Sequence, residues 1–278
     1  MNQRLAVLLV VFTAMLAASV SAAVRLPSIV GDDMVLQRNV TLKIWGWADP
    51  GEHVAVTFRG AHHETIADPQ GRWQLALPPL KAGGPDDMEL AGTNRIVLHD
   101  VLVGDVWLCG GQSNMTHTFV RWQERYAQEI AASDDPEIRQ FAVPTKPVLT
   151  GPLDDIPGLS WKRANPNNLL DFTVIGYFFA KKLHDRYHVP QGLIMSCVGG
   201  TRIEAWTSAE GFRDFPDELA TIAQNQDTAY VDKVNADAKA AREAAGPRGA
   251  PDAGLAGPVK WFEPAYQPRN WKRIGVPG

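Results

Sequence analysis

Ser113 is the residue of this sequence whose surroundings best fit nucleophilic chemistry. It follows the short apolar segment 103–109 in the run Gly-Gly-Gln-Ser-Asn over residues 110–114. A serine attacks acyl groups when its hydroxyl is exposed on a rigid turn and nearby backbone N–H groups stabilise the oxyanion. The glycines allow that close backbone approach, but a phosphate-binding turn or a simple packing turn would share them. The sequence lacks both the full Walker spacing and the G-x-G-x-x-G fingerprint, which weakens the phosphate-binding alternative.

A second glycine turn follows a second apolar segment. Gly199 and Gly200 end the run 191–198, and the segment 172–186 before it has apolar residues at helical spacing. A helix, a buried strand and a glycine turn in this order predict a parallel sheet, whose ligands bind beyond the carboxyl ends of the strands. Both turns should then face one crevice. Either Gly199 or Gly200 can offer an N–H group to the oxyanion on Ser113.

The elements before this region have a different pattern. Short segments of alternating or apolar character occupy 40–47, 54–58, 73–77 and 95–99, with Pro/Gly-rich turns and loops between them. Short strands with frequent turns and no helical period predict a small β-sandwich over residues 23–102. The polar, Ala-rich stretch 208–245 predicts exposed helices. A Pro/Gly/Ala linker is expected over 246–257.

The N-terminus has the pattern of a secretory signal peptide. One positive residue, Arg4, precedes the nearly unbroken apolar run 5–16 and the small-residue stretch 17–23. The apolar run is too short to span a bilayer, which argues against the alternative of an uncleaved anchor. We expect cleavage after residue 22 or 23, a periplasmic or secreted protein, and no membrane association after cleavage.

Composition and cysteine usage exclude several classes of partner. Apolar residues make up 45% and charged residues 21% of the chain, as in ordinary globular proteins, and the net charge of −4 gives no basic surplus for nucleic acid. Cys109 and Cys197 have no zinc-site spacing, and the pair His62–His63 lacks an acidic or thiol partner at a useful distance. We therefore expect no metal site. The two cysteines can form a disulfide in an oxidising compartment, but small buried thiols are the favoured alternative.

Two blocks of the sequence resemble one known family. Residues 107–115, Trp-Leu-Cys-Gly-Gly-Gln-Ser-Asn-Met, and residues 192–206, which include Gly-Gly-Thr-Arg-Ile-Glu-Ala-Trp, are similar to blocks of bacterial sialate O-acetylesterases in the SGNH hydrolase superfamily. The opening segment 26–37 resembles the N-terminal β domain of that family. The resemblance implies an α/β fold, with the β-sandwich followed by a partial three-layer αβα domain with a parallel sheet over residues 103–278.

The resemblance also implies roles for individual residues. Ser113 would be the nucleophile, and its own N–H and that of Gly199 or Gly200 would stabilise the oxyanion. The reaction would be hydrolysis of O-acetyl esters on sialic acid or related sugars, without metal or organic cofactor. Substrate contacts are expected from five side chains, although core packing for the tryptophan and a solvated position for the arginine are open alternatives. These side chains are Gln112, Asn114, Arg202, Glu204 and Trp206.

The sequence departs from the family in its C-terminal part. Members carry an Asp-x-x-His block there, preceded by a block with an Asn or Gln oxyanion donor, and neither is visible; no histidine follows His188. We therefore expect a C-terminally truncated member with an impaired esterase. His117 can substitute as the base only if a carboxylate orients it, so a surface or capping role is favoured. His184 and His188 are expected to complement the C-terminus of the predicted helix.

Two other functions share these features. A carbohydrate acetylesterase acting on plant-polymer acetyl groups would use the same serine chemistry. An inactive carbohydrate-binding remnant would keep the aromatic residues without turnover. The sequence leaves the sugar, the acetyl position and the oligomeric state open.

Overall fold

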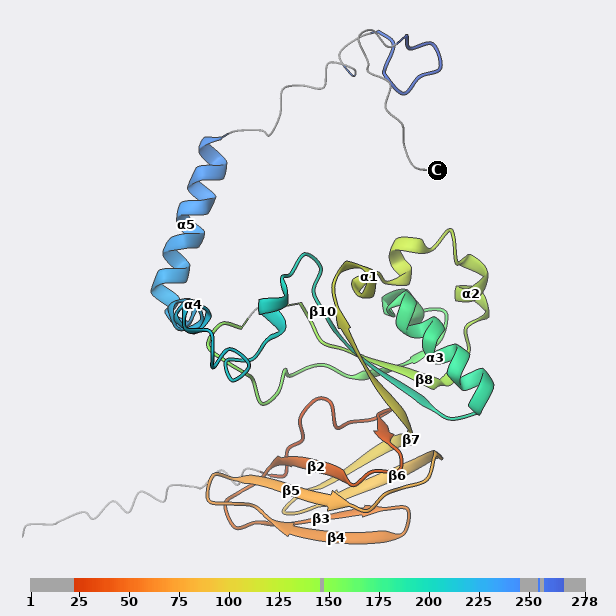
Figure 1. Ribbon diagram of the computed structural model, residues 1–278. Helices are drawn as coiled ribbons and strands as arrows, with labels where there is room; N and C mark the ends of the chain where they lie inside the picture. Colours follow the sequence, from red (N-terminus) through yellow and green to blue (C-terminus); the bar gives the residue numbers. More distant parts are fainter. Residues whose placement is uncertain (1–22, 146–147, 246–254, 256–257, 268–278) are drawn as a thin grey trace, which may run out of the picture. The chain divides into compact units, whose positions relative to one another are not determined.

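The structure is a computed structural model that describes residues 23–145, 148–245, 255 and 258–267 (Figure 1). The predicted signal peptide, most of the predicted linker and the last residues lie outside the described part. The chain divides into two compact units, residues 1–148 with 152–206 and residues 149–151 with 207–278. No helix of the described part is long and apolar enough to cross a membrane.

The N-terminal part of the first unit is a β-sandwich. A four-stranded antiparallel layer in the order β4-β3-β6-β7 faces the two-stranded antiparallel sheet β2-β5, and the short β1 pairs with β7 in parallel. In β2 and β5 buried and exposed residues alternate, so each strand gives one face to the core. These strands are β1 (Val35–Gln37), β2 (Leu42–Trp47), β3 (His53–Phe58), β4 (Ala61–Ile66), β5 (Arg72–Leu77), β6 (Gly83–Ala91) and β7 (Arg95–Gly111).

Strand β7 continues out of the sandwich into a second layer. Its first part pairs with β6, with Arg95 opposite Ala91, and its last part pairs in parallel with β10 from Asp105 to Gly111. Gly104 lies at the change of partner, and a Cβ added there would stand 2.0 Å from the Pro190 carbonyl oxygen. Only glycine fits this crossing, because any side chain would collide with backbone.

The second layer is the parallel sheet that the sequence predicts. Its order is β7-β10-β8-β9, in which the first three strands run parallel and β9 is antiparallel. Helices of the first unit cover one face of this sheet, where α3 packs on β7 through Gly176. The elements are α1 (Ser113–Thr116), η1 (Phe119–Trp122), α2 (Ala127–Ala132), β8 (Asp135–Ala142), β9 (Trp161–Ala164), η2 (Asn168–Asp171), α3 (Val174–Tyr187), β10 (Gln191–Cys197) and η3 (Ile203–Trp206).

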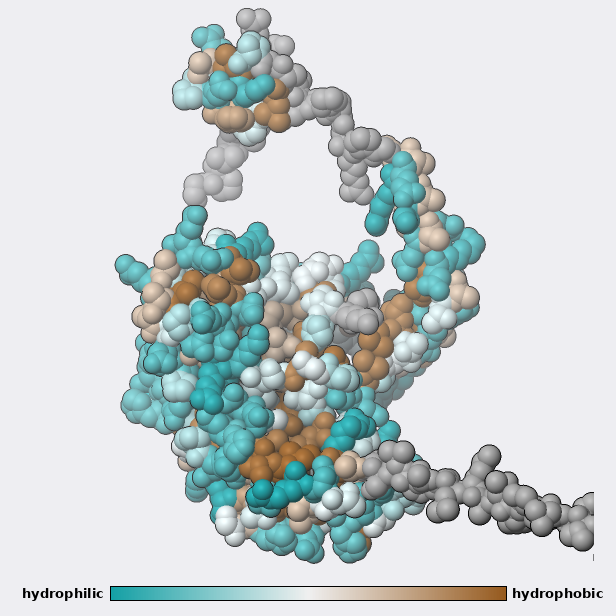
Figure 2. All heavy atoms as spheres, turned by 180° about the vertical axis from the view of Figure 1, so that it is seen from behind, coloured by the Kyte–Doolittle hydropathy of each residue, from teal (hydrophilic) through white to brown (hydrophobic). Residues whose placement is uncertain are grey.

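Aromatic residues fill the space between this sheet and its helices. Phe119 and Tyr177 are fully buried there and meet edge to face at 5.4 Å between ring centroids. The phenol of Tyr177 donates a 2.7 Å hydrogen bond to Asp135, and burial, with this carboxylate, raises its pKa. On the other face of the sheet, Leu108 is 73% exposed. Figure 2 shows apolar residues gathered in separate patches on a largely hydrophilic surface.

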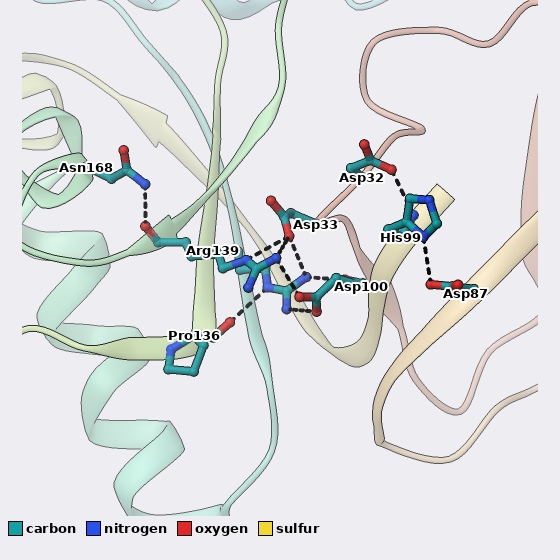
Figure 3. Close-up of polar contacts among 9 residues, drawn as sticks. Asp32, Asp33, Asp87, His99, Asp100, Pro136, Arg139 and Asn168 are labelled. Atoms are coloured by element: carbon teal, nitrogen blue, oxygen red, sulfur yellow. Dashed lines mark hydrogen bonds and ion pairs between the residues drawn. The ribbon is translucent and has the colours of Figure 1, made fainter. Parts of the chain in front are cut away.

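A network of four charged side chains joins the sandwich to the parallel sheet (Figure 3). Arg139 of β8 is 2% exposed and donates to the carboxylate of Asp100 on β7 at 2.6 Å, to the carbonyl of Asp100 and to that of Pro136. Arg163 of β9 binds Asp33 and Asp100 at 2.6 and 2.5 Å. Burial lowers the pKa of Arg139 in spite of its carboxylate partners, which is the electrostatic cost of placing a charge between the layers.

The described part of the second unit includes the helices α4 (Pro216–Gln226) and α5 (Thr228–Ala244). Asp227 ends α4 and caps α5, since its carboxylate accepts from the N–H groups of Ala229 and Tyr230. Neither helix has a buried residue. The prediction of exposed helices over 208–245 is confirmed.

The fold class is confirmed as α/β with a mixed sheet that contains parallel strands. The four predicted strand segments lie in β2, β3, β5 and β7, and the predicted helix 172–186 is α3. The Pro/Gly-rich loop expected between the segments 73–77 and 95–99 is partly wrong, because β6 occupies Gly83–Ala91. The expected domain boundary between residues 102 and 103 falls inside β7. Within the first unit, α1, α2 and α3 lie together on one side of the parallel sheet (Figure 1).

We expect Asp100→Asn to lower the free energy of unfolding by about 3 kcal/mol, because Arg139 then remains buried without its closest counter-charge. Asparagine suits this position, since residue 100 has a left-handed backbone with φ 59°. The control is Glu89→Gln, which breaks the exposed Glu89–Arg95 pair and should leave the unfolding midpoint in urea unchanged. Equal midpoints for both variants would contradict a stabilising role of the network.

Candidate active site

The two glycine turns lie side by side at the carboxyl edge of the parallel sheet. The register of β7 and β10 places Gly111 opposite Cys197, and the N–H of Val198 donates to the carbonyl of Gly111 at 3.0 Å. Gly111 has a φ of 124°, a conformation that a residue with a side chain rarely adopts. The chain therefore turns sharply after β7 and enters α1 at Ser113.

Ser113 is exposed on the first turn of α1. The hydroxyl of Thr116 donates to the Ser113 carbonyl at 2.9 Å, and Thr173 donates to the carbonyl of Met115 at 2.7 Å, which ties the short helix to α3. In the described part of the chain, no side chain forms a hydrogen bond with Ser113 Oγ, and no backbone carbonyl accepts from the Ser113 N–H. The serine is thus presented on a fixed turn with its reactive groups available.

The structure distinguishes the two glycines that sequence reasoning left equivalent. A Cβ added to Gly199 would lie 3.5 Å from Ser113 Oγ, whereas one added to Gly200 would meet nothing within 4 Å. Gly200 has a φ of 77° and shapes the turn. The N–H of Gly199 has no backbone acceptor among the described residues. Gly199 is therefore the nearer candidate for the second oxyanion donor.

Thr201 connects the two turns, and sequence reasoning did not single it out. Its carbonyl accepts a hydrogen bond from the amide of Gln112, beside the nucleophile. Its hydroxyl donates to the Val198 carbonyl at 2.9 Å and accepts from the Trp206 indole at 2.8 Å. A threonine directly after two glycines at a strand end is the pattern that could have indicated this role.

The remaining predicted substrate residues surround the turn without touching Ser113. Asn114 follows the nucleophile on α1 and is exposed, as are Arg202 and Glu204 on the segment after β10. The side chain of Trp206 is 40% exposed to solvent, so it does not pack in the core. These side chains are accessible to a ligand. No contact between them and Ser113 defines a binding pose.

His117 is not arranged as a general base. Its Nε2 lies 3.0 Å from Nη1 of Arg121, and because a guanidinium can only donate, Nε2 is the acceptor. The lone pair that would take a proton is thus engaged by a cation, where a catalytic histidine needs an orienting carboxylate. His184 pairs with Glu137 at 2.8 Å, and His188 ends α3 in a left-handed conformation with φ 51°. Both occupy the end of α3, as expected.

Cys109 and Cys197 are free, buried thiols on neighbouring strands below the turn. The favoured alternative for these residues is confirmed. Burial, together with the neighbouring Cys197, raises the pKa of Cys109 to about 11, and burial also raises that of Cys197. No group of three or more potential ligands forms a metal site in the part of the chain that the structure describes. His62 of the edge strand β4 instead binds Glu64 of the same strand and Thr57 of β3.

An exposed serine on a glycine turn beyond a central parallel strand, with backbone N–H groups beside it, defines a hydrolase-type α/β domain. A family described as carbohydrate esterase, sialic acid-specific acetylesterase, matches residues 103–242. The chain belongs to this family.

Relatives with known names agree with this assignment. The sialate O-acetylesterase of Pongo abelii is 33% identical over 210 residues, which cover 68% of this chain and 40% of that protein. That of Mus musculus is 34% identical over 203 residues, covering 66% and 37%. A solved structure, the carbohydrate acetylesterase XAC1771 from Xanthomonas citri, is 40% identical with a TM-score of 0.65, covering 68% of this chain and 43% of that chain. The chain thus spans about 40% of the length of these relatives.

We expect Thr201→Val to loosen the second turn, because valine keeps the shape of threonine but loses both hydrogen bonds of its hydroxyl. Hydrogen exchange of the backbone from Val198 to Trp206 should become faster. Thr201→Ser, which keeps the hydroxyl, is the matched control and should exchange like the wild type. Equal exchange in the valine variant would show that the hydroxyl does not hold the turn.

We expect both cysteines to resist alkylation in the native protein. With a pKa of about 11 for Cys109 and an ordinary value of 9.0, about 1% of this thiol is ionised at pH 9 in the folded chain and about half in the unfolded chain. The raised pKa therefore costs stability as the pH rises from 9 towards 11. Iodoacetamide labelling followed by mass spectrometry, with and without urea, measures the difference. Fast native labelling would contradict the buried positions.

Proposed function

We propose that this chain carries the nucleophile of a serine esterase that removes O-acetyl groups from sugars. The observation that supports it best is the register of β7 and β10, which sets Gly199 beside the exposed Ser113. Membership of the carbohydrate esterase family supports the reaction class. Names of relatives include both a sialate O-acetylesterase and a carbohydrate acetylesterase, so the substrate class is an acetylated sugar.

The proposed reaction proceeds by acyl transfer. Ser113 Oγ attacks the acetyl carbonyl while its proton passes to a general base, and the N–H groups of Ser113 and Gly199 stabilise the oxyanion. The C–O bond to the sugar then breaks, the sugar oxygen takes the proton, and water hydrolyses the acetyl-serine to acetate. Arg202, Glu204 and Trp206, with Gln112 and Asn114, would contact the sugar. Arg202 can bind a sialic carboxylate through two parallel hydrogen bonds.

The general base is the part of this proposal that the described residues do not supply. His117 is engaged by Arg121, and the sequence has no Asp-x-x-His block after His188. We propose that such a block, in a segment beyond this sequence or in a partner chain, completes the site. Without it the loss in kcat should reach several orders of magnitude.

We propose that the protein is periplasmic or secreted. This proposal rests on the pattern of residues 1–22, which is that of a cleavable signal peptide.

We expect the isolated chain to hydrolyse p-nitrophenyl acetate little faster than its Ser113→Ala variant. Adding a separately expressed segment of a family member that carries the Asp-x-x-His block should produce an acetate release that depends on Ser113. His117→Gln serves as the control and should behave like the wild type in both assays, because His117 lacks an orienting carboxylate.

Three outcomes would contradict the proposal. Hydrolysis by the isolated chain that needs both Ser113 and His117 would make His117 the base. Activity that persists in Ser113→Ala would remove the serine from the mechanism. If the chain together with the added Asp-x-x-His segment releases no acetate from either O-acetyl sialic acid or acetylated xylo-oligosaccharides, an inactive carbohydrate-binding remnant would be favoured. The ratio of rates on these two substrates separates the sialic acid and plant-polymer alternatives.

A further inference from the structure

An open groove lies on the outer face of the β-sandwich, in a part of the first unit that the esterase proposal does not use. Its volume is about 470 Å³, and strands β2, β4 and β5 supply most of its lining. It lies among the strands of the sandwich, whereas Ser113 stands beyond the carboxyl end of β7. The groove is therefore separate from the serine site.

Two tryptophans of β2 give the groove its apolar surface. Trp45 and Trp47 are two residues apart, so their side chains leave the strand on the same face, opposite Gln74 and Arg72 of β5. Trp45 retains 37% of its surface. The guanidinium of Arg25 lies 4.0 Å from the ring centroid of Trp47, which fixes that indole. Trp45 thus offers an exposed, flat aromatic surface on a rigid strand.

The polar groups of the groove carry little uncompensated charge. Arg72 and Asp154 form an ion pair at 3.0 Å, and the carboxylate of Asp68 accepts from the N–H groups of Gln70 and Arg72 at 2.9 and 2.8 Å. Thr65 donates to the carbonyl of Gln74 at 3.1 Å, which fixes β4 against β5. The side chains of Arg72, Gln74 and Asp154 can still donate to or accept from a ligand. Hydrogen bonds of both kinds, with one guanidinium and two carboxylates in the lining, suit a neutral, hydroxyl-rich ligand better than an acidic one.

The floor of the groove contains an unpaired donor. Trp73 of β5 is 2% exposed and lines the groove, and its Nε1–H has no hydrogen-bond partner among the described residues. A buried donor without an acceptor costs free energy. Gly46 is the partner of Trp73 across β2 and β5, and a Cβ added there would stand 2.8 Å from Trp73 Cζ2, so the glycine makes room for this indole between the strands.

We propose that this groove binds a neutral glycan chain. One face of a pyranose ring consists of C–H groups that stack on an indole, and its hydroxyls donate and accept at the rim, which matches Trp45 and the polar groups around it. The open form of the groove suits a stretch of polysaccharide, which can extend past both ends. The β-sandwich would then keep the protein attached to the polysaccharide. This proposal does not depend on the esterase activity.

Isothermal titration of the full chain with cellohexaose, xylohexaose and mannohexaose tests the proposal, with hexagalacturonic acid as the charged counterpart. At least one neutral hexasaccharide should bind. Trp45→Ala should weaken it about tenfold, and Trp45→Phe, which keeps an aromatic face, should weaken it by less than about threefold. Tyr230→Ala, which removes an aromatic residue of the same exposure on α5, should bind like the wild type. Circular dichroism and the melting temperature check that each variant folds.

The outcomes are decisive in each direction. Loss of binding in Trp45→Ala with retention in Tyr230→Ala supports the groove. Absence of binding to every neutral probe overturns the proposal, as does binding that Trp45→Ala leaves unchanged. Tighter binding of hexagalacturonic acid than of the neutral probes overturns the assignment of a neutral ligand. None of these results involves acetate release, so failure here and failure of the esterase proposal are separate.

Discussion

The continuity of strand β7 is the constraint on which the rest of the first unit depends. Its first part is a strand of the sandwich, and its last part is a strand of the parallel sheet. The crossing requires glycine at position 104, because the carbonyl of Pro190 occupies the place of a side chain. Arg139 and Arg163, from β8 and β9, bind the carboxylates of Asp33 and Asp100, from the sandwich side, and so hold the two layers in one register.

This continuity also determines where the serine lies. The same strand that is anchored in the sandwich ends at Gly111, two residues before Ser113, and its pairing with β10 brings Gly199 to the hydroxyl. The helices α1 and α3 fix the turn from the covered face, through Thr116 and Thr173. The sandwich supports the serine site through the backbone of β7. In our proposal, the groove around Trp45 binds a separate ligand, a neutral glycan chain.

The elements that the sequence failed to predict share a physical cause. Strand β4 is an edge strand in which His62, His63 and Glu64 interrupt any apolar alternation, so pairing with β3 decides its conformation. Strand β6 begins with Gly-Gly-Pro, which is typical of a loop, and becomes a strand because β3 and β7 lie on either side of it. Strand β8 begins Asp-Pro-Glu, and its central Arg139 is buried only because Asp100 comes to it from another part of the chain.

The sequence by itself determined the two glycine turns, the serine, the helix before the second turn and the alternating strands, because each of these depends on residues close together in the chain. It also determined the family, through blocks that combine these local features. Only the tertiary structure decided between Gly199 and Gly200, joined Thr201 to Gln112 and Trp206, and engaged His117 with Arg121. Those outcomes depend on how two parallel strands meet and which side chains they bring within hydrogen-bonding distance, and local spacing in the chain carries no information about that.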